Sequence, residues 1–169
     1  ISTALVMIMT PAVALYYGGM VADDNVLNRM VRTFVNLGLI GFQFTAVGYS
    51  LAFAPSNPYL WNLVGDFSFA AMGSVGSSPA GCAAESYGIP HSVFVMYQYM
   101  FASITTTILS GSIANLMSFH SFCLFILMWT TFVYDPLCHA IWGGGLMSWH
   151  LDFAGGLVIH VSSGASAAA

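Results

Sequence analysis

The chain has 169 residues, of which 58% are hydrophobic and 5% are charged, and its formal net charge is −4. A soluble domain carries about 25% charged residues, so this composition excludes a water-soluble surface. Two basic residues in the whole chain provide no polybasic patch for lipid and no indication of nucleic-acid binding. Cys123 and Cys138 lie on one apolar stretch, about 22 Å apart if it is helical, and cannot bridge each other. We expect the cysteines to be buried.

Apolar runs of membrane-spanning length follow one another along the chain. A membrane helix needs about 20 apolar residues. The first run is interpreted as a helix and not as a cleaved signal peptide, because YYGGM is not a small-residue cleavage site. The pattern predicts an all-α membrane protein, a polytopic helical bundle that forms a single transmembrane domain over residues 1–169, truncated at both ends. The predicted spans are 1–20, 31–54, 90–117, 119–142 and 152–169.

Orientation depends on two arginines. Arg29 and Arg32 stand beside the connection between the first and second spans, and the positive-inside rule places such residues in the cytoplasm. The N-terminus, the Gly-, Ser- and Pro-rich segment 56–89 and the GGGLMSWH turn are then expected to face outward, and the fifth span to run inward.

The stretch HLDFAGGLVIH places two ionisable residues in an apolar span. As an α-helix it would carry His160 about 12 Å further into the membrane than Asp152, about 80° around the axis. Asp152 at a helix start either caps backbone N–H groups or makes the outer end of the helix negative, and one carboxylate can do both. His160 is flanked on its row by Gly156 and Gly164, which indicates close packing or room for a small molecule. An intramembrane histidine favours a functional site, with a packing histidine as the alternative.

The outer end of the fourth span adds further candidates. Pro136 is expected to kink the helix, and His139 and Trp142 share one face. Trp142 is either an interfacial anchor or a cation site, since an indole face attracts ammonium-type ions by roughly 0.5–2 kcal/mol. Asp135, beside the kink, is expected to bond to freed backbone groups or to face another subunit.

The third span predicts a packing seam. Phe101 lies on its outer half and, taken alone, is expected to be a core or lipid-facing residue. Small side chains follow it at four-residue spacing on one row, which favours close approach of a neighbouring helix: Ala102, Thr106, Ser110 and Ala114.

Several motifs together resemble the ammonium transporter family, which includes the Amt, Mep and Rhesus proteins. They are STALVMIMTPAVALYYGGMV, NVLNRM, GYSLAFA, CHAIWGGG and LDFAGGLVIH, in register over nearly the whole chain. The resemblance implies the first five-helix repeat of an eleven-helix ammonium transporter fold with two inverted repeats, with a pore in each subunit of a homotrimer. It implies a multi-pass protein of the plasma membrane, N-terminus outside, that is not an enzyme and uses no cofactor or metal.

The resemblance also assigns roles to four residues. Trp142 matches the tryptophan of an outer aromatic ammonium site, and Phe101 matches the phenylalanine stacked over the pore entrance. Asp152 matches the aspartate that shapes this site, and His160 the first of two pore histidines. The implied mechanism recruits ammonium, or methylammonium as an analogue, deprotonates it and conducts ammonia past the histidines. The segment between Trp142 and Asp152 is shorter than usual in the family, which leaves their relative position open.

Three other function classes remain. A transport-incompetent ammonium sensor would keep Trp142 and Asp152 but alter the pore. The presence of His160 argues against this class. A Rhesus-like gas channel would lack the aromatic cation site. The presence of Trp142 argues against this class. A membrane metalloenzyme would use Asp152, His160 and His139 as ligands. None of these three is spaced three or four residues from another within one helix, so the metal hypothesis is the weakest.

Overall fold

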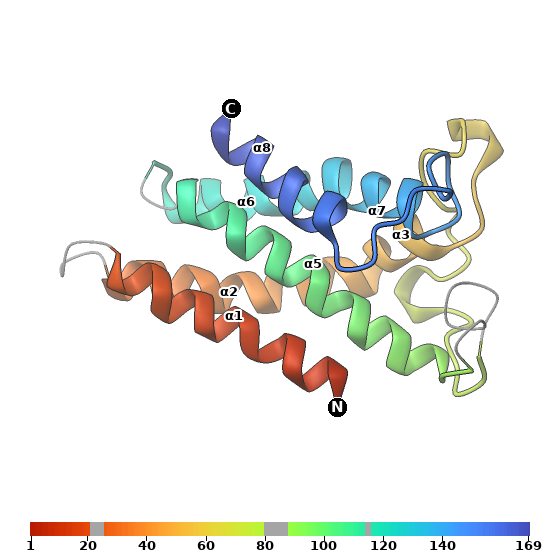
Figure 1. Cartoon of the computed structure of the whole chain (residues 1–169), viewed down its shortest axis with the longest axis horizontal. Coiled ribbons are helices and arrows are strands. Elements are labelled where there is room, and N and C mark those ends of the chain that lie inside the picture. Colours follow the sequence, from red (N-terminus) through yellow and green to blue (C-terminus); the bar gives the residue numbers. More distant parts are fainter. Residues whose placement is uncertain (21–25, 80–87, 114–115) are drawn as a thin grey trace.

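The computed structural model describes residues 1–20, 26–79, 88–113 and 116–169. The described residues form helices and loops, with one isolated antiparallel bridge between Ser56 and Gly65 and no strand among them. The prediction of an all-helical protein is confirmed for this part of the chain (Figure 1). Ala114 of the predicted seam lies outside the described ranges, as does Cys82, the third cysteine of the chain.

The long helices lie side by side along the molecule (Figure 1). Four described segments are long and apolar enough to cross a membrane. The second of these segments begins at Val26, five residues before the start predicted from the sequence. The helices are α1 Ser2–Gly19, α2 Val26–Gln43, η2 Phe44–Gly48, α3 Tyr49–Phe53, α5 His91–Ile113, α6 Phe119–Trp129, η5 Thr130–Tyr134, α7 Asp135–Ile141, η6 Gly156–Val161 and α8 Ser162–Ala168, with short 3-10 turns η3 Pro58–Leu60 and η4 Ala70–Met72 in the loop between α3 and α5.

Helix α2 buries its polar face and exposes its apolar one. Its buried side chains recur every three to four residues and are mostly polar, while Phe34 and Phe42 are exposed. The Asn36 amide nitrogen donates to the hydroxyls of Thr106 and Thr107 on α5, at 2.8 and 3.0 Å. This arrangement suits a membrane, where polar side chains must find partners inside the bundle and apolar ones can face lipid.

Helix α5 is the centre of the bundle and packs against α1, α2 and α8. Ala102, Thr106 and Ser110 are buried, which confirms the predicted small-residue seam over its described part. Gly111 continues this close packing, since a Cβ there would lie 2.5 Å from the ring of Tyr17 on α1. The small residues therefore allow the helices to approach closely.

Three of the described helical segments are π-helical: η2, η5 and η6. Each lies within or at the start of a predicted span, and such segments insert an extra residue per turn, often at functional sites. The segment η5 ends just before Asp135 and Pro136, so the fourth span changes its winding where the sequence predicts a kink.

The hydrogen-bond partner of Asp135 is not the one expected from the sequence. Its side chain is fully buried, and its Oδ2 atom accepts a 2.7 Å hydrogen bond from the Gln43 amide nitrogen. The partner is thus a side chain of this chain, on the neighbouring span, in place of freed backbone or another subunit. The π-helical segment η2 starts one residue after Gln43, and η5 ends one residue before Asp135.

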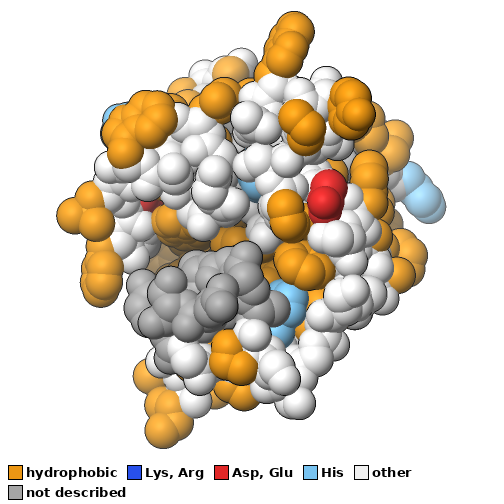
Figure 2. Space-filling view, turned by 90° about the vertical axis from the view of Figure 1, so that its right-hand side faces the viewer, with side chains coloured by type: hydrophobic (Ala, Val, Ile, Leu, Met, Phe, Trp, Pro, Cys, Tyr) orange, Lys and Arg blue, Asp and Glu red, His pale blue; other side chains and the backbone are white. Residues whose placement is uncertain are grey.

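The two ends of the bundle differ in charge. Both arginines lie near the start of α2, where Arg29 donates to the Gly111 carbonyl at 2.6 Å and Arg32 to the Met117 carbonyl at 3.0 Å. The opposite end carries the long loops, and Figure 2, which views it directly, shows hydrophobic side chains around its rim and no Lys or Arg. Exposed aromatic side chains on these loops suit a membrane–water interface: Tyr59, Trp61, Phe67, Trp149 and Phe153.

Candidate functional site

Trp142 and Phe101 meet at the loop end of the bundle. Their ring centroids are 6.0 Å apart with planes at 65°, an edge-to-face arrangement. Phe101 comes from α5 and Trp142 from the residue that follows α7, and both side chains are partly exposed. Tyr97, one turn before Phe101, packs edge-on against it at 4.8 Å. The three rings form a partly exposed aromatic cluster with edge-to-face contacts.

Asp152 caps the last helix. Its Oδ1 accepts the backbone N–H of Gly156 at 2.7 Å, and its Oδ2 accepts those of Leu157 and Val158 at 2.9 and 3.0 Å. These are N–H groups that a helix start leaves without partners. The structure therefore confirms the capping interpretation, and the helix begins at Gly156 instead of residue 152.

The short connection also brings Asp152 against Trp142. The indole Nε1 donates to the Asp152 backbone carbonyl at 2.8 Å. The turn between them contains Gly144 with φ +86°, a backbone conformation that glycine adopts without strain. The question of their relative position is thereby answered, because the short segment folds back and joins the two residues directly.

His160 lies on an exposed stripe of η6 and α8. Gly156, His160 and Gly164 are all exposed, whereas Val158 and Ser163 are buried toward the bundle. The helix is π-helical from Gly156 to Val161, so the α-helical estimate of the angle between Asp152 and His160 does not hold. Within the described part of the chain, the imidazole makes none of the contacts that join Trp142, Phe101 and Asp152.

His139 is a structural residue of this region. Its side chain is fully buried, with Nδ1 3.1 Å from the Ala52 carbonyl and Nε2 3.0 Å from the Ser56 hydroxyl. Gly143 allows this packing, because a Cβ on it would lie 2.0 Å from the Ala52 carbonyl and 2.7 Å from His139 Nδ1. His139 thus joins α7 to α3 and holds the turn that carries Trp142.

The ligand set of the metalloenzyme hypothesis is not brought together. Both ring nitrogens of His139 have partners, and the Asp152 carboxylate accepts three N–H groups. No three His, Cys, Asp or Glu side chains among the described residues lie close enough to hold a metal ion. The geometry gives this hypothesis no support.

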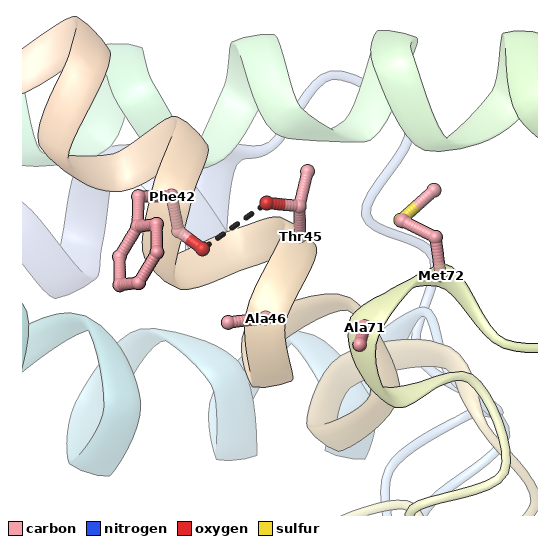
Figure 3. Close-up of a pocket in the computed structure, with 5 residues that line it drawn as sticks. All are labelled: Phe42, Thr45, Ala46, Ala71 and Met72. Carbon is pink, nitrogen blue, oxygen red and sulfur yellow. Dashed lines mark hydrogen bonds between the residues drawn. The ribbon is translucent and has the colours of Figure 1, made fainter.

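A shallow hollow lies elsewhere, between η2 and η4. Figure 3 shows its five lining residues, and Thr45 among them donates to the Phe42 carbonyl at 3.1 Å. Its lining is mainly apolar and includes none of the predicted site residues: Phe42, Thr45, Ala46, Ala71 and Met72.

The aromatic cluster, the capping aspartate and the exposed histidine occur in a chain that one family model matches from end to end. The Ammonium Transporter Family model covers residues 1–169. The chain belongs to this family. It is 43% identical over 162 residues to an ammonium transporter of Bacillus subtilis, a match that covers 95% of this chain and 38% of the relative. Ammonium transporter Amt1 of Archaeoglobus fulgidus is 37% identical over 170 residues, which cover 99% of this chain and 40% of that protein.

Solved structures agree with the family assignment. The crystal structure of Candida albicans Mep2 matches with a TM-score of 0.85 at 31% identity, over 99% of this chain and 36% of that one. Saccharomyces cerevisiae Mep2 matches with a TM-score of 0.84 at 26% identity, again over 99% and 36%. The chain of this ammonium transporter family member therefore spans about two-fifths of the length of the relatives that it matches.

Two polar pairs of this family member escape sequence reasoning. Gln43 pairs with Asp135, and His91, the first residue of α5, has its Nε2 2.6 Å from the Tyr49 hydroxyl and its ring centroid 4.8 Å from that of Phe69. The signal available in the sequence is a polar residue inside an apolar span. That signal marks burial, but it does not tell which helix supplies the partner.

Proposed function

We propose that the whole protein moves ammonium across a membrane, and that Trp142, Phe101 and Asp152 form the outer site where the ion is recruited. The observation that supports the proposal best is the edge-to-face pair of Phe101 and Trp142, with the indole held by the backbone of Asp152. A fixed, partly exposed indole offers its π face to a cation without a further ordering cost.

The residues of this site would act in different ways. The indole of Trp142 attracts the ammonium ion through its ring quadrupole, by roughly 0.5–2 kcal/mol. Asp152 contributes mainly by holding the start of η6, since its carboxylate oxygens are engaged with three N–H groups. Its negative charge adds attraction for a cation at the same mouth.

His160 would serve the crossing step. A charged ion is costly to carry through an apolar interior, so we propose that ammonium loses its proton near the aromatic site and crosses as ammonia. The exposed stripe around His160 provides a lining of small side chains with one imidazole, a group that can accept or donate a proton.

The placement of the arginines supports an orientation. Arg29 and Arg32 stand at the end opposite the long loops and the aromatic cluster. By the positive-inside rule the cluster would face the outside and the N-terminus with it. A plasma-membrane homotrimer stays a prediction from the family resemblance.

Trp142→Leu in the whole protein should lower the apparent affinity for methylammonium by on the order of 2- to 30-fold, because the indole face is worth roughly 0.5–2 kcal/mol to a cation. Trp142→Phe should lower the affinity less, because it keeps an aromatic ring. It still loses the hydrogen bond to Asp152, so we expect some loss. Concentration-dependent uptake in transporter-deficient cells, with protein yield determined on the same cultures, provides the measurement.

The matched control is Trp149→Leu, which removes an exposed indole from the same loop. Affinity should stay at the level of the unmodified protein in this control. A Trp142→Leu protein with reduced yield and native affinity would assign Trp142 to membrane anchoring and contradict its role in the outer site.

His160→Ala should leave the fold intact and abolish or uncouple charge movement. The substitution removes an exposed ring from the surface of the described structure, so the melting temperature should stay within about 2 °C of the unmodified protein. Electrical recording on reconstituted protein measures the ammonium-induced current, with His150→Ala, an exposed loop histidine, as the control. Native current and ion selectivity in His160→Ala would return the residue to a packing role.

A further inference from the structure

Asp135 and Gln43 form a buried polar pair that the transport proposal does not use. Asp135 is 0% and Gln43 5% exposed, and both lie within segments long and apolar enough to cross a membrane. The Gln43 amide nitrogen donates to Asp135 Oδ2 at 2.7 Å and approaches the Thr131 hydroxyl at 3.1 Å. The Oδ1 atom of Asp135 is buried and has no partner among the described residues.

Within the described part of the chain, no lysine or arginine pairs with this carboxyl group. The chain has two Lys or Arg residues in all, and Arg29 and Arg32 bind backbone carbonyls near the other end of α2. A fully buried carboxylate with one neutral donor would bear a desolvation cost of several kcal/mol without compensation.

The groups that face Asp135 from both spans are neutral. Gln43 of α2 is an amide, and Thr131 of η5 is a hydroxyl that donates to the Leu127 carbonyl. Tyr134 and Cys138, the titratable side chains beside Asp135 on its own span, carry no charge in their protonated forms. Nothing around the carboxyl group in the described structure balances a negative charge.

The free oxygen atoms fit a proton better than a metal ion. The Gln43 carbonyl oxygen also lacks a partner in the described structure, but it is pressed against Gly48, where a Cβ would lie only 2.6 Å away. Of the oxygen atoms of this pair, Asp135 Oδ1 is then the one left available to a ligand. Metal cations such as Mg²⁺ and Ca²⁺ take six or more oxygen ligands, whereas a proton needs one.

We propose that Asp135 is a proton-binding site inside the helical bundle, which holds its proton as a neutral carboxylic acid paired with Gln43. The site is separate from Trp142, Asp152 and His160, and does not depend on their proposed roles. In the neutral acid the Oδ2 atom is the carbonyl oxygen that accepts from Gln43, and the proton is on Oδ1. The pair links the second and fourth spans at the level of two π-helical segments.

Infrared spectroscopy on the purified whole protein tests this assignment directly. A protonated carboxyl group gives a C=O stretching band that a carboxylate lacks. At neutral pH this band should be present in the unmodified protein and absent from Asp135→Asn. The Asp135→Asn protein should melt within about 3 °C of the unmodified protein, because asparagine is a neutral isostere that can still accept from Gln43.

The matched control is Asp66→Asn, which changes a carboxylate in the loop after α3 that accepts the Ser68 N–H and should leave the band in place. Gln43→Met gives a second readout that holds even if Asp135→Asn does not fold. It removes the donor to Oδ2, so the C=O band should move to higher frequency. A band that persists in folded Asp135→Asn, or that stays at the same frequency in Gln43→Met, would overturn the proposal.

Discussion

Gly143→Ala should abolish the accumulation of correctly folded protein. The added Cβ would lie 2.0 Å from the Ala52 carbonyl, 2.7 Å from His139 Nδ1 and 2.9 Å from His139 Cα. Two of these atoms belong to the backbones of α3 and α7, so no side-chain rotation relieves the clash. Overpacking costs about 1–3 kcal/mol where side chains can adjust, and we expect about 3 kcal/mol or more here.

The measurement for Gly143→Ala is the yield of monodisperse protein after detergent extraction, with the melting temperature of whatever remains. Gly38→Ala is the matched control, because Gly38 lies in α2 and a Cβ added to it would meet nothing within 4 Å. That control should equal or slightly exceed the unmodified protein, since alanine favours a helix over glycine by about 0.5–1 kcal/mol. Equal yields from both variants would show that α3 and α7 do not approach each other this closely.

Substitutions of Asp152 should separate its capping from its charge. Asp152→Asn keeps one oxygen acceptor but turns an N–H donor toward one of the three backbone N–H groups, at a cost of about 1 kcal/mol. Asp152→Ala loses all three hydrogen bonds, and we expect about 2 kcal/mol or more. Affinity for methylammonium should fall in both variants, and further in alanine, because loss of the cap loosens the backbone whose Asp152 carbonyl accepts from the Trp142 indole.

Melting temperature and uptake affinity on the same preparations check the Asp152 series. Asp66→Ala removes one negative charge from a loop at the same end of the molecule and controls for long-range electrostatics. If Asp152→Asn lowers stability while affinity stays native, the carboxylate serves as a cap alone. If affinity falls equally in Asp66→Ala, the effect belongs to the net charge of that end and not to Asp152.

The helical fold and its four long apolar helices could be predicted from the sequence because hydropathy and length constrain a chain in lipid strongly. The seam of Ala102, Thr106 and Ser110 could be predicted for the same reason, since small residues at four-residue spacing have few other uses in a membrane helix. The Asp152 cap also has a local signature, a carboxylate just before a helix.

The rest depends on tertiary geometry that local patterns do not contain. Periodicity counted at about 3.6 residues per turn misses the π-helical segments, and the helical estimate of the angle from Asp152 to His160 does not apply because the helix begins at Gly156 and is π-helical as far as Val161. The partner of Asp135 lies 92 positions away in sequence, on another span. The aromatic role of Phe101 likewise becomes visible only when α5 and the turn after α7 place its ring beside Trp142.

The winding of η5 decides how the fourth span responds to a change in its number of residues. The π-helical turn holds about one residue more than an α-helical turn, so removing one residue between Thr130 and Tyr134 should restore α-helical hydrogen bonding and leave Asp135, His139 and Trp142 close to their present directions. A deletion within α6, which is α-helical and has no extra residue to give up, would instead rotate the two parts of the span against each other by about 100° and draw them together by about 1.5 Å. The same loss of one residue is therefore mild or severe according to the winding of the segment that loses it.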